Sequence, residues 1–401
     1  MIKKYSFILQ MLLIFTACHK EEDKLPLSKS TLIYMVADNN LDYYAVENIK
    51  KMEQGIPENA KGNIFVFIDR NMNGNPNHPY LLQIHRDTTN NAITSTILQT
   101  YREQNSCHPQ FLRSVIDNVW QYCNKQNSVL SRLVLWSHGT GWLPEETPFN
   151  DIDAKVRPLS FGMDNTGDIN DTSYHKEMDI KDLKVALNGL YFELLIIDAC
   201  FMGSIEVAYE LRNNFDYMIL SPSEILSSGF PYIDISEDLV SDELDARVIA
   251  DRFFNHYNSQ SGVLQSATIS VIHTEHLENL ASKMQYVYQK YVAMVEFSPS
   301  PIETIPQYDR TMSNYFFDFG HFLSYTLAND DYDDIMGTLN NILPYYKHTE
   351  QMFSTLDLSA TTGLSVYIPN TYYRREWLHT YYQMLEWTKN SGADILLGIA
   401  L

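Results

Sequence analysis

Residues Glu193 to Leu211 read Glu-Leu-Leu-Ile-Ile-Asp-Ala-Cys-Phe-Met-Gly-Ser-Ile-Glu-Val-Ala-Tyr-Glu-Leu. Leu194 to Ile197 is a short run of branched apolar residues, which is typical of a strand buried on both faces. Ser204 to Leu211 has apolar residues at helical spacing, and we expect Gly203 to ease the turn before it. Cys200 is therefore predicted to follow the carboxyl end of a central strand, close to a helix start whose partial positive charge favours the thiolate.

A second stretch has the same design. Ser131 to Trp136 predicts a strand that runs into Ser137-His138-Gly139-Thr140-Gly141. If the two strands are parallel neighbours, His138 and Cys200 meet at the edge where open α/β sheets build their sites. A thiol with a pKa of about 8.5 needs a base such as imidazole to take its proton. The amides of Gly139 and Cys200 would then donate to the oxyanion of an acyl-transfer reaction.

Each motif alone is a weak signal. A lone cysteine after a strand is usually a small buried apolar residue, and a lone His-Gly pair is usually a loop. We assign either motif alone a prior of roughly one in ten for catalysis, since short motifs often match by chance. The prediction depends on both motifs, each at the end of a strand.

The two motifs, Ser137 to Trp142 (Ser-His-Gly-Thr-Gly-Trp) and Asp198 to Gly203 (Asp-Ala-Cys-Phe-Met-Gly), resemble the clostripain family of cysteine peptidases. That family shares a clan with caspases, legumains and gingipains. The opening Tyr34 to Asp42 resembles the family's first strand and its acidic, Asn-rich loop, and the resemblance extends from about Thr31 to about Tyr232. It implies a caspase-like three-layer α/β/α sandwich with a mostly parallel central sheet. It also implies a cysteine endopeptidase with a Cys–His dyad.

The resemblance implies a preference for Arg or Lys at the cleaved bond. Asp198 matches the family's acidic residue in the specificity pocket; its alternative role is to cap the following helix. In the family, the segment after the next strand is also rich in acidic residues. Here only Glu224 is acidic, and Ile225 to Phe230 follow it, which weakens the inference of a strict arginine preference. Asp198 and Glu224 are the predicted substrate-binding residues.

The connection between the two catalytic strands, residues 143–178, is predicted to hold an exposed loop from Leu143 to Val156. Clostripain-like enzymes resemble zymogens that are cut after a basic residue in this connection. The corresponding candidates for self-processing are Lys155 and Arg157. A plain surface loop is the equal alternative.

Composition limits the class of protein. Of 401 residues, 45% are hydrophobic, so the chain can bury a large core. The formal net charge is −21, with 50 acidic and 29 basic residues, which argues against a nucleic-acid partner. An acidic protein is compatible with basic substrates. We expect a monomer that acts on a peptide or protein.

Residues 1–17 have the pattern of a signal peptide, with Lys3 and Lys4 before the short apolar run Phe7 to Phe15. The run is too short for a stable membrane-spanning helix. Phe15 to Cys18 resembles a bacterial lipobox, which implies lipidation of Cys18 and a polar tether over 18–30. The expected location is the cell envelope, anchored to the outer membrane or the periplasmic face, or the cell surface. An ordinary secretory signal is the alternative.

Two further cysteines, Cys107 and Cys123, could form a disulfide in an oxidising compartment, and the sequence leaves this open. No Cys/His cluster has zinc-ligand spacing. Family members can bind calcium, and one acidic stretch offers hard oxygen ligands, namely Asp38, Asn39, Asn40 and Asp42. Such a cluster is more often a solvated turn. Calcium is therefore left unassigned, and no cofactor is expected.

The order of predicted elements is strand, helix, strand, hairpin, helix, strand, helix, strand, which is typical of an α/β sheet with right-handed crossovers. We assign residues 31–235 to the catalytic core and 236–401 to a C-terminal α/β extension. In the extension we expect, among other elements, a strand over Ser266 to Ile272 and a helix over Tyr332 to Tyr346. The sequence leaves open whether this extension is a second subdomain or adds layers to the sheet.

Two other functions fit the sequence. One is a surface lipoprotein that binds peptide or glycan without catalysis, which the many Tyr and Trp residues permit. The other is a thiol amidase on the same scaffold. The residues around the pocket separate these functions, because acidic groups near Asp198 favour basic peptides. An apolar pocket from Ile225, Leu226 and Phe230 would favour another substrate.

Overall fold

The fold is seen in a computed structural model, which describes residues 27–71, 78–89, 91–145, 160–165, 177–292, 304–310, 314–369 and 376–399. The strands of its main sheet are β1 (Ser28–Ala37), β2 (Ile64–Arg70), β3 (Tyr80–Gln83), β4 (Thr96–Thr100), β5 (Ser128–Trp136), β6 (Phe192–Asp198), β7 (Phe215–Leu220), β8 (Thr268–His273) and β10 (Tyr345–His348).

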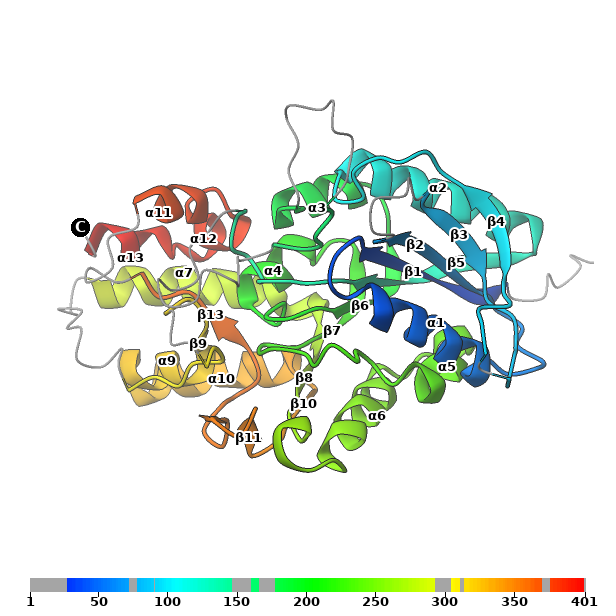
Figure 1. The fold of residues 1–401 in the computed structure, drawn as a ribbon. Helices are drawn as coiled ribbons and strands as arrows, with labels where there is room; N and C mark the ends of the chain where they lie inside the picture. Colours follow the sequence, from blue (N-terminus) through cyan, green and yellow to red (C-terminus); the bar gives the residue numbers. More distant parts are fainter. Residues whose placement is uncertain are drawn as a thin grey trace, which may run out of the picture.

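These nine strands form one sheet in the order β10-β8-β7-β6-β5-β1-β2-β3-β4 (Figure 1). The central strands β7, β6, β5, β1 and β2 run parallel. Antiparallel strands flank them on both sides. Because the parallel strands all end at one edge, that edge collects the loops that follow them.

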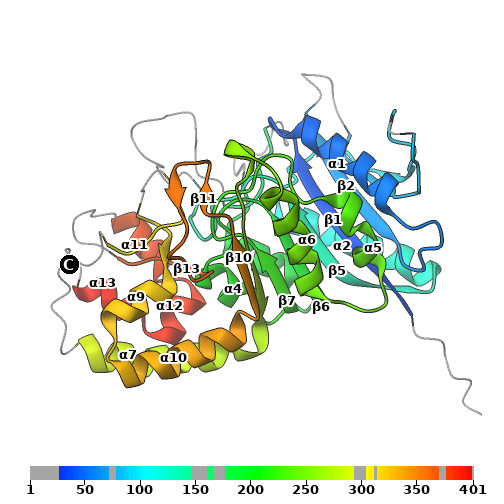
Figure 2. The same ribbon diagram turned by 90° about the horizontal axis from the view of Figure 1, so that it is seen from below.

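Helices cover both faces of the sheet. One face carries α2 (Pro109–Lys125), α3 (Ile180–Leu187) and α4 (Ile205–Leu211). The other carries α1 (Asp42–Gly55), α5 (Tyr232–Val240) and α6 (Ala246–Asn258), which lie together in front of the sheet in Figure 2. The predicted three-layer α/β/α sandwich with a mostly parallel sheet is therefore confirmed.

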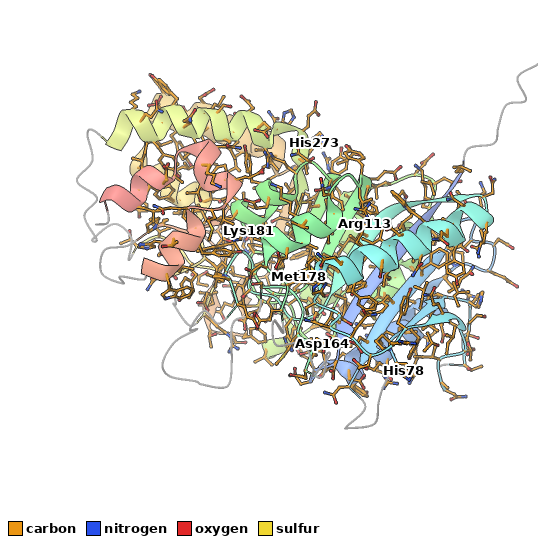
Figure 3. The ribbon with its side chains drawn as sticks, turned by 90° about the horizontal axis from the view of Figure 1, so that it is seen from above. His78, Arg113, Asp164, Met178, Lys181 and His273 are labelled. Atoms are coloured by element: carbon orange, nitrogen blue, oxygen red, sulfur yellow. The ribbon has the colours of Figure 1, made fainter. Side chains whose placement is uncertain are left out.

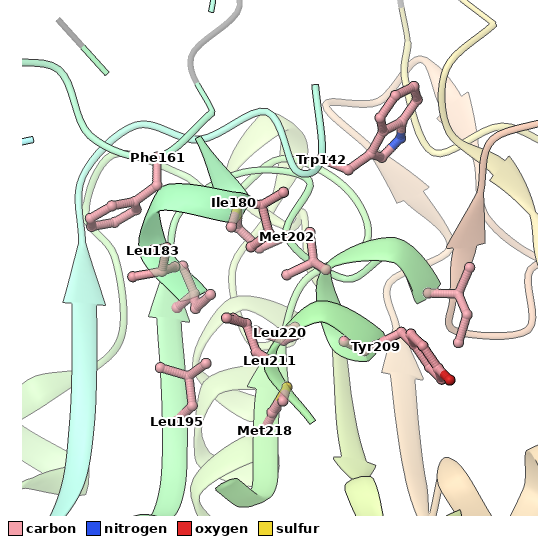
Figure 4. Packing of buried hydrophobic residues seen from close by; sticks show 14 of the residues in the cluster. Trp142, Phe161, Ile180, Leu183, Leu195, Met202, Tyr209, Leu211, Met218 and Leu220 are labelled. Carbon is pink, nitrogen blue, oxygen red and sulfur yellow. The ribbon is translucent and has the colours of Figure 1, made fainter. Parts of the chain in front are cut away.

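The central strands are apolar because they are buried on both faces. In β1, Leu32, Tyr34 and Val36 pack under α2, while Ile33 and Met35 pack under α1. All five are fully buried, which accounts for a continuous apolar run in place of an alternating one. The same packing continues over β6, because Leu195 belongs to one buried cluster with Met202 and the α4 residues Tyr209 and Leu211 (Figure 4).

The C-terminal part adds both strands and helices. Its remaining elements are η1 (Gly262–Leu264), η2 (Thr274–His276), α7 (Leu277–Val292), β9 (Phe317–Asp318), α9 (Phe319–Thr326), α10 (Asn329–Ile342), β11 (Gln351–Met352), β12 (Leu356–Asp357), β13 (Ser365–Val366), α11 (Glu376–Tyr382), α12 (Glu386–Ser391) and α13 (Asp394–Ile399). Strands β8 and β10 extend the main sheet, and residues of α7 and α12 belong to the same apolar cluster as α4. The extension therefore continues the sheet and its core.

Several predicted boundaries differ from the structure. The helix predicted over Tyr332 to Tyr346 ends at Ile342, and Tyr345 begins β10. Leu343 precedes Pro344, and a residue before proline is disfavoured in helical conformation. Strand β1 begins at Ser28, inside the segment predicted as a tether. In the part of the chain that the structure describes, no helix has the length and apolar character to cross a membrane.

Candidate active site

The two predicted catalytic motifs lie at one edge of the sheet. Strands β5 and β6 are parallel neighbours, and Trp136 pairs with Asp198 at their carboxyl ends. The Ser137 N–H donates to the Asp198 carbonyl at 3.3 Å, which carries the pairing past the strands. His138 and Cys200 each follow two residues after this last pair, so they leave the sheet side by side.

The two loops approach so closely that their small residues are required. A Cβ on Gly139 would lie 2.9 Å from the Cβ of Ala199 and 2.9 Å from the Cys200 carbonyl oxygen. After the cysteine, Phe201 makes the sharp turn with a φ of 61°, a value that glycine was expected to supply. Gly203 is needed for a different reason, because a Cβ there would lie 2.4 Å from the Pro222 nitrogen.

The Cys200 thiol is half-buried and bonded to the backbone of the next loop. The Ile225 N–H donates to its Sγ at 3.3 Å, and the thiol lies 3.7 Å from the Ile225 carbonyl oxygen. Burial raises the pKa of this thiol to about 12, and nearby Glu224 and Asp198 raise it further. The prediction that a helix start lowers the pKa of this thiol is wrong for this structure. Burial is the largest effect on the pKa, and α4 begins only at Ile205.

His138 is half-buried and bonded to Asn40. Its Nε2 lies 2.7 Å from the Asn40 Oδ1. Since an amide oxygen can only accept a hydrogen bond, Nε2 carries the proton and Nδ1 keeps a lone pair. Burial lowers the pKa of His138 to about 4, so the ring is a neutral base at pH 7. This role of Asn40 was not predicted from the sequence, in which Asn40 is one of the candidate calcium ligands.

The predicted oxyanion donors are the amides of Gly139 and Cys200. On either side of Gly139, the Thr140 N–H donates to Ser160 and the Gly162 N–H donates to the His138 carbonyl. Within the ranges that the structure describes, neither the Gly139 nor the Cys200 amide donates a hydrogen bond to another residue. Both amides therefore keep their donor capacity for a ligand.

Asp198 is a buried carboxylate, with an exposed fraction of 4%. Its Oδ2 accepts hydrogen bonds from the Phe230 N–H at 3.0 Å and from the Tyr232 hydroxyl at 2.9 Å. Burial raises its pKa to about 6, against the lowering effect of these two donors. The alternative role as a cap of α4 is wrong, because the Ser204 side chain accepts from Val207 in that position.

Glu224 already has a cationic partner. The Nε of Arg310 lies 2.8 Å from its Oε2, and the Glu224 side chain is only 18% exposed. Burial raises the pKa of Glu224 while Arg310 lowers it. Of the apolar residues considered for the pocket, Phe230 is fully buried against Phe253 and cannot line an open surface. Ile225 and Leu226 are half-buried beside Glu224.

The candidate calcium ligands have protein partners. Asp42 binds Arg70 through both carboxylate oxygens at 2.8 and 2.9 Å. The Asn39 amide donates to the Val36 and Met163 carbonyls and thereby holds the loop that presents Asn40. These contacts tie the acidic, Asn-rich loop to the rest of the fold.

Elsewhere in the described ranges, one group of three side chains has metal-ligand spacing, namely His273, Glu275 and His276. His273 ends β8, which runs antiparallel to β7, so the group lies at the sheet edge opposite Cys200. In Figure 3, His273 accordingly lies far from Asp164. Asp164 follows Phe161, which forms a strand bridge with Gly139 in the loop of His138. This group does not join the candidate active site.

Three predicted residues lie outside the described ranges. These are the processing candidates Lys155 and Arg157 and the lipidation candidate Cys18. Cys107 and Cys123 are both free and buried, so the disulfide that the sequence permitted is not formed.

The chain is similar in sequence to known proteins. The family model described as the clostripain family matches residues 33–397, which include both motifs and the C-terminal extension. The chain belongs to the clostripain family of cysteine peptidases. Clostripain from Hathewaya histolytica is 25% identical in an alignment of 226 residues that covers 51% of this chain and 41% of that one. This chain therefore spans less than half the length of that relative.

Solved structures of the same family share the fold. An inactive zymogen C11 protease from Parabacteroides distasonis is 30% identical, with a TM-score of 0.71, over 92% of this chain and 99% of that one. A secreted C11 cysteine protease from Bacteroides thetaiotaomicron has a TM-score of 0.73 and 25% identity in a complex with an irreversible peptide inhibitor, over 92% and 100% of the two chains. The sandwich is therefore the caspase-like fold that the resemblance implied.

Proposed function

We propose that this chain is a cysteine endopeptidase that uses a Cys200–His138 dyad and favours a basic residue at the cleaved bond. The observation that carries the proposal is the pairing of β5 with β6, which brings a thiol and a neutral imidazole to one edge. The inhibitor-bound relative, which is a C11 cysteine protease, supports peptide hydrolysis as the reaction.

The proposed reaction uses the protonation states of the resting site. The Cys200 Sγ bonds to the scissile carbonyl carbon while its proton passes to the Nδ1 of His138. The tetrahedral intermediate collapses, the C–N bond breaks, and His138 returns the proton to the leaving amine. Water then attacks the thioester with His138 as base, which releases the acid and restores the thiol.

Two groups support this chemistry. The Gly139 and Cys200 amides have donor capacity for the oxyanion. Asn40 acts as a positioning residue, because its amide oxygen holds Nε2–H and so leaves Nδ1 for the thiol proton. That hydrogen bond gains strength when His138 becomes charged in the transition state.

The basic preference is proposed from two carboxylates. Asp198 and Glu224 both lie near enough to Cys200 to raise the pKa of its thiol. Buried carboxylates need charged or hydrogen-bonded partners, and an Arg or Lys side chain of a substrate would be one. Because Asp198 is held by Phe230 and Tyr232, its position is set before substrate arrives.

Maturation and location complete the proposal. We infer self-cleavage after Lys155 or Arg157 in the 143–178 connection, by analogy with the relative that is an inactive zymogen. We infer lipidation of Cys18 and a place in the cell envelope from the lipobox-like leader. The B. thetaiotaomicron relative is a secreted protease, which is compatible with export.

The test is hydrolysis of a peptide-reporter library by the mature protein and by Cys200→Ala. Cys123→Ala is the matched control, since Cys123 is a buried free thiol on α2. We expect wild type and Cys123→Ala to cleave reporters with Arg or Lys at the bond and Cys200→Ala to lose activity. Intact mass and a denaturing gel of the same samples report the lipid on Cys18 and cleavage in the 143–178 connection.

The other outcomes separate the alternatives. Cys200-dependent cleavage with another preference would keep the peptidase and remove Asp198 from the subsite. Cys200-dependent release of ammonia from small amides, without peptide cleavage, would favour the thiol amidase. No turnover even after limited tryptic nicking would favour a lipoprotein that binds peptide or glycan. Active protein that stays a single chain would remove self-processing.

A further inference from the structure

The C-terminal extension delivers an arginine to the candidate active site. The Arg310 Nε donates to both Glu224 carboxylate oxygens, at 2.8 and 3.1 Å. Its guanidinium carbon lies 4.7 Å from the centre of the Phe353 ring. Glu224 immediately precedes Ile225, whose N–H donates to the Cys200 Sγ. Arg310 of this chain therefore pairs with Glu224, the carboxylate next to the candidate nucleophile Cys200.

The segment that carries Arg310 is fixed beside Glu224. The Ser223 hydroxyl donates to the Tyr308 carbonyl at 2.7 Å. Tyr308 is fully buried, and its hydroxyl donates to Asp318 at 2.8 Å and accepts from the Gly363 N–H at 2.7 Å. These buried contacts hold the main chain two residues before Arg310, so the guanidinium starts within reach of Glu224.

The two partners of this ion pair differ in exposure. The Glu224 side chain is 18% exposed, whereas the Arg310 side chain is 46% exposed. A half-exposed guanidinium can leave the ion pair and be hydrated. The mostly buried Glu224 carboxylate then needs another cation as a partner.

We propose that Arg310 is an internal occupant of the basic-residue subsite. Its guanidinium takes the place on Glu224 that the Arg or Lys side chain of a substrate would take, so a basic substrate must displace it. The inference rests on the proposed function. Since bound Arg310 lowers the fraction of open subsite, it weakens the apparent affinity for basic substrates and leaves neutral ones unaffected.

The test compares Arg310→Ala with Arg252→Ala. Arg252 is a close match, because its Nε lies 2.8 Å from Asp238 Oδ2, with side chains 42% and 21% exposed. The reporters carry Arg, Lys or Leu at the cleaved bond. In Arg310→Ala we expect KM for the Arg and Lys reporters to fall about two- to fivefold, the range for a partly exposed ion pair. The kcat values, the Leu reporter and Arg252→Ala should stay at wild-type values.

A second variant checks that Glu224 is the shared ligand. Glu224→Gln should raise KM for the Arg reporter. When Arg310→Ala is added to Glu224→Gln, this KM should not fall. If Arg310→Ala leaves KM for basic reporters unchanged, or raises it for all three, Arg310 supports the loop and the inference is overturned.

Binding to inactive protein separates this inference from the proposed function. In a Cys200→Ala background, the dissociation constant of a fluorescent Arg-containing peptide should fall when Arg310→Ala is added. This readout needs no turnover. A tighter complex would support displacement of Arg310 even if the wild type cleaved no peptide, and an unchanged constant would refute it even if the wild type were an active peptidase.

Discussion

Replacing Asn40 with alanine tests how His138 is positioned. In the resting site the contact is a neutral hydrogen bond of 2.7 Å, worth about 0.5–1.5 kcal/mol. In the transition state His138 is an imidazolium, and a hydrogen bond to a charged group is worth about 1.5–3 kcal/mol. Because alanine also removes the resting contact, only the difference between the two strengths, about 1–1.5 kcal/mol, is lost from transition-state stabilisation, so kcat/KM should fall roughly five- to 13-fold.

The assay measures kcat/KM for Asn40→Ala on the best reporter, beside Asn255→Ala. Asn255 donates to Asp251 at 2.7 Å on an exposed helix surface and serves as the matched amide deletion. Asn40 is itself exposed, so we expect thermal unfolding of both variants within a few degrees of wild type. Asn40→Asp adds a second readout, the pH dependence of kcat/KM, which would not change if Asn40 had only a structural role.

A carboxylate at position 40 would stabilise protonated His138 and raise its pKa above about 4. The acid limb of kcat/KM should then move to higher pH in Asn40→Asp, while activity at pH 8 stays above that of Asn40→Ala. If Asn40→Ala keeps kcat/KM within twofold of wild type, or the acid limb of Asn40→Asp does not move, Asn40 does not position His138.

Two further predictions follow from the site. The pKa of Asp198 is raised to about 6, and the proposed basic-residue subsite uses its carboxylate, so kcat/KM on an Arg reporter should fall below about pH 6. The Leu reporter should keep its activity until His138 protonates near pH 4, and coincident acid limbs would contradict this assignment. Gly203→Ala should lower the free energy of unfolding in urea by about 1–3 kcal/mol, since its Cβ would lie 2.4 Å from Pro222 nitrogen. Gly337→Ala, in α10 with open space around it, should be neutral or stabilising, and equal effects would refute the packing argument.

Much of the site could be predicted because its signals are local. A branched apolar run ending in a polar motif predicts a buried strand and the residue that follows it. Two such runs are enough to place His138 and Cys200 at strand ends. Pairing of β5 with β6 then decides that the two ends are neighbours.

Contacts between distant segments could not be predicted from local patterns. Asn40 and His138 are 98 residues apart, and Glu224 and Arg310 are 86 residues apart. Asn40 has the same composition signal as any polar turn, and Arg310 as any surface arginine. Their roles depend on which loops the sheet and its extension bring together.

The sequence by itself determined the α/β class, the buried central strands and the two motifs, because burial periodicity and turn chemistry are properties of short stretches. Only the tertiary structure decided the electrostatic state of the two candidate catalytic residues. Burial holds Cys200 as a thiol and His138 as a neutral base, opposite to the thiolate expected at a helix start. How deeply a side chain is buried depends on neighbours from the whole chain, so a short stretch of sequence does not determine it.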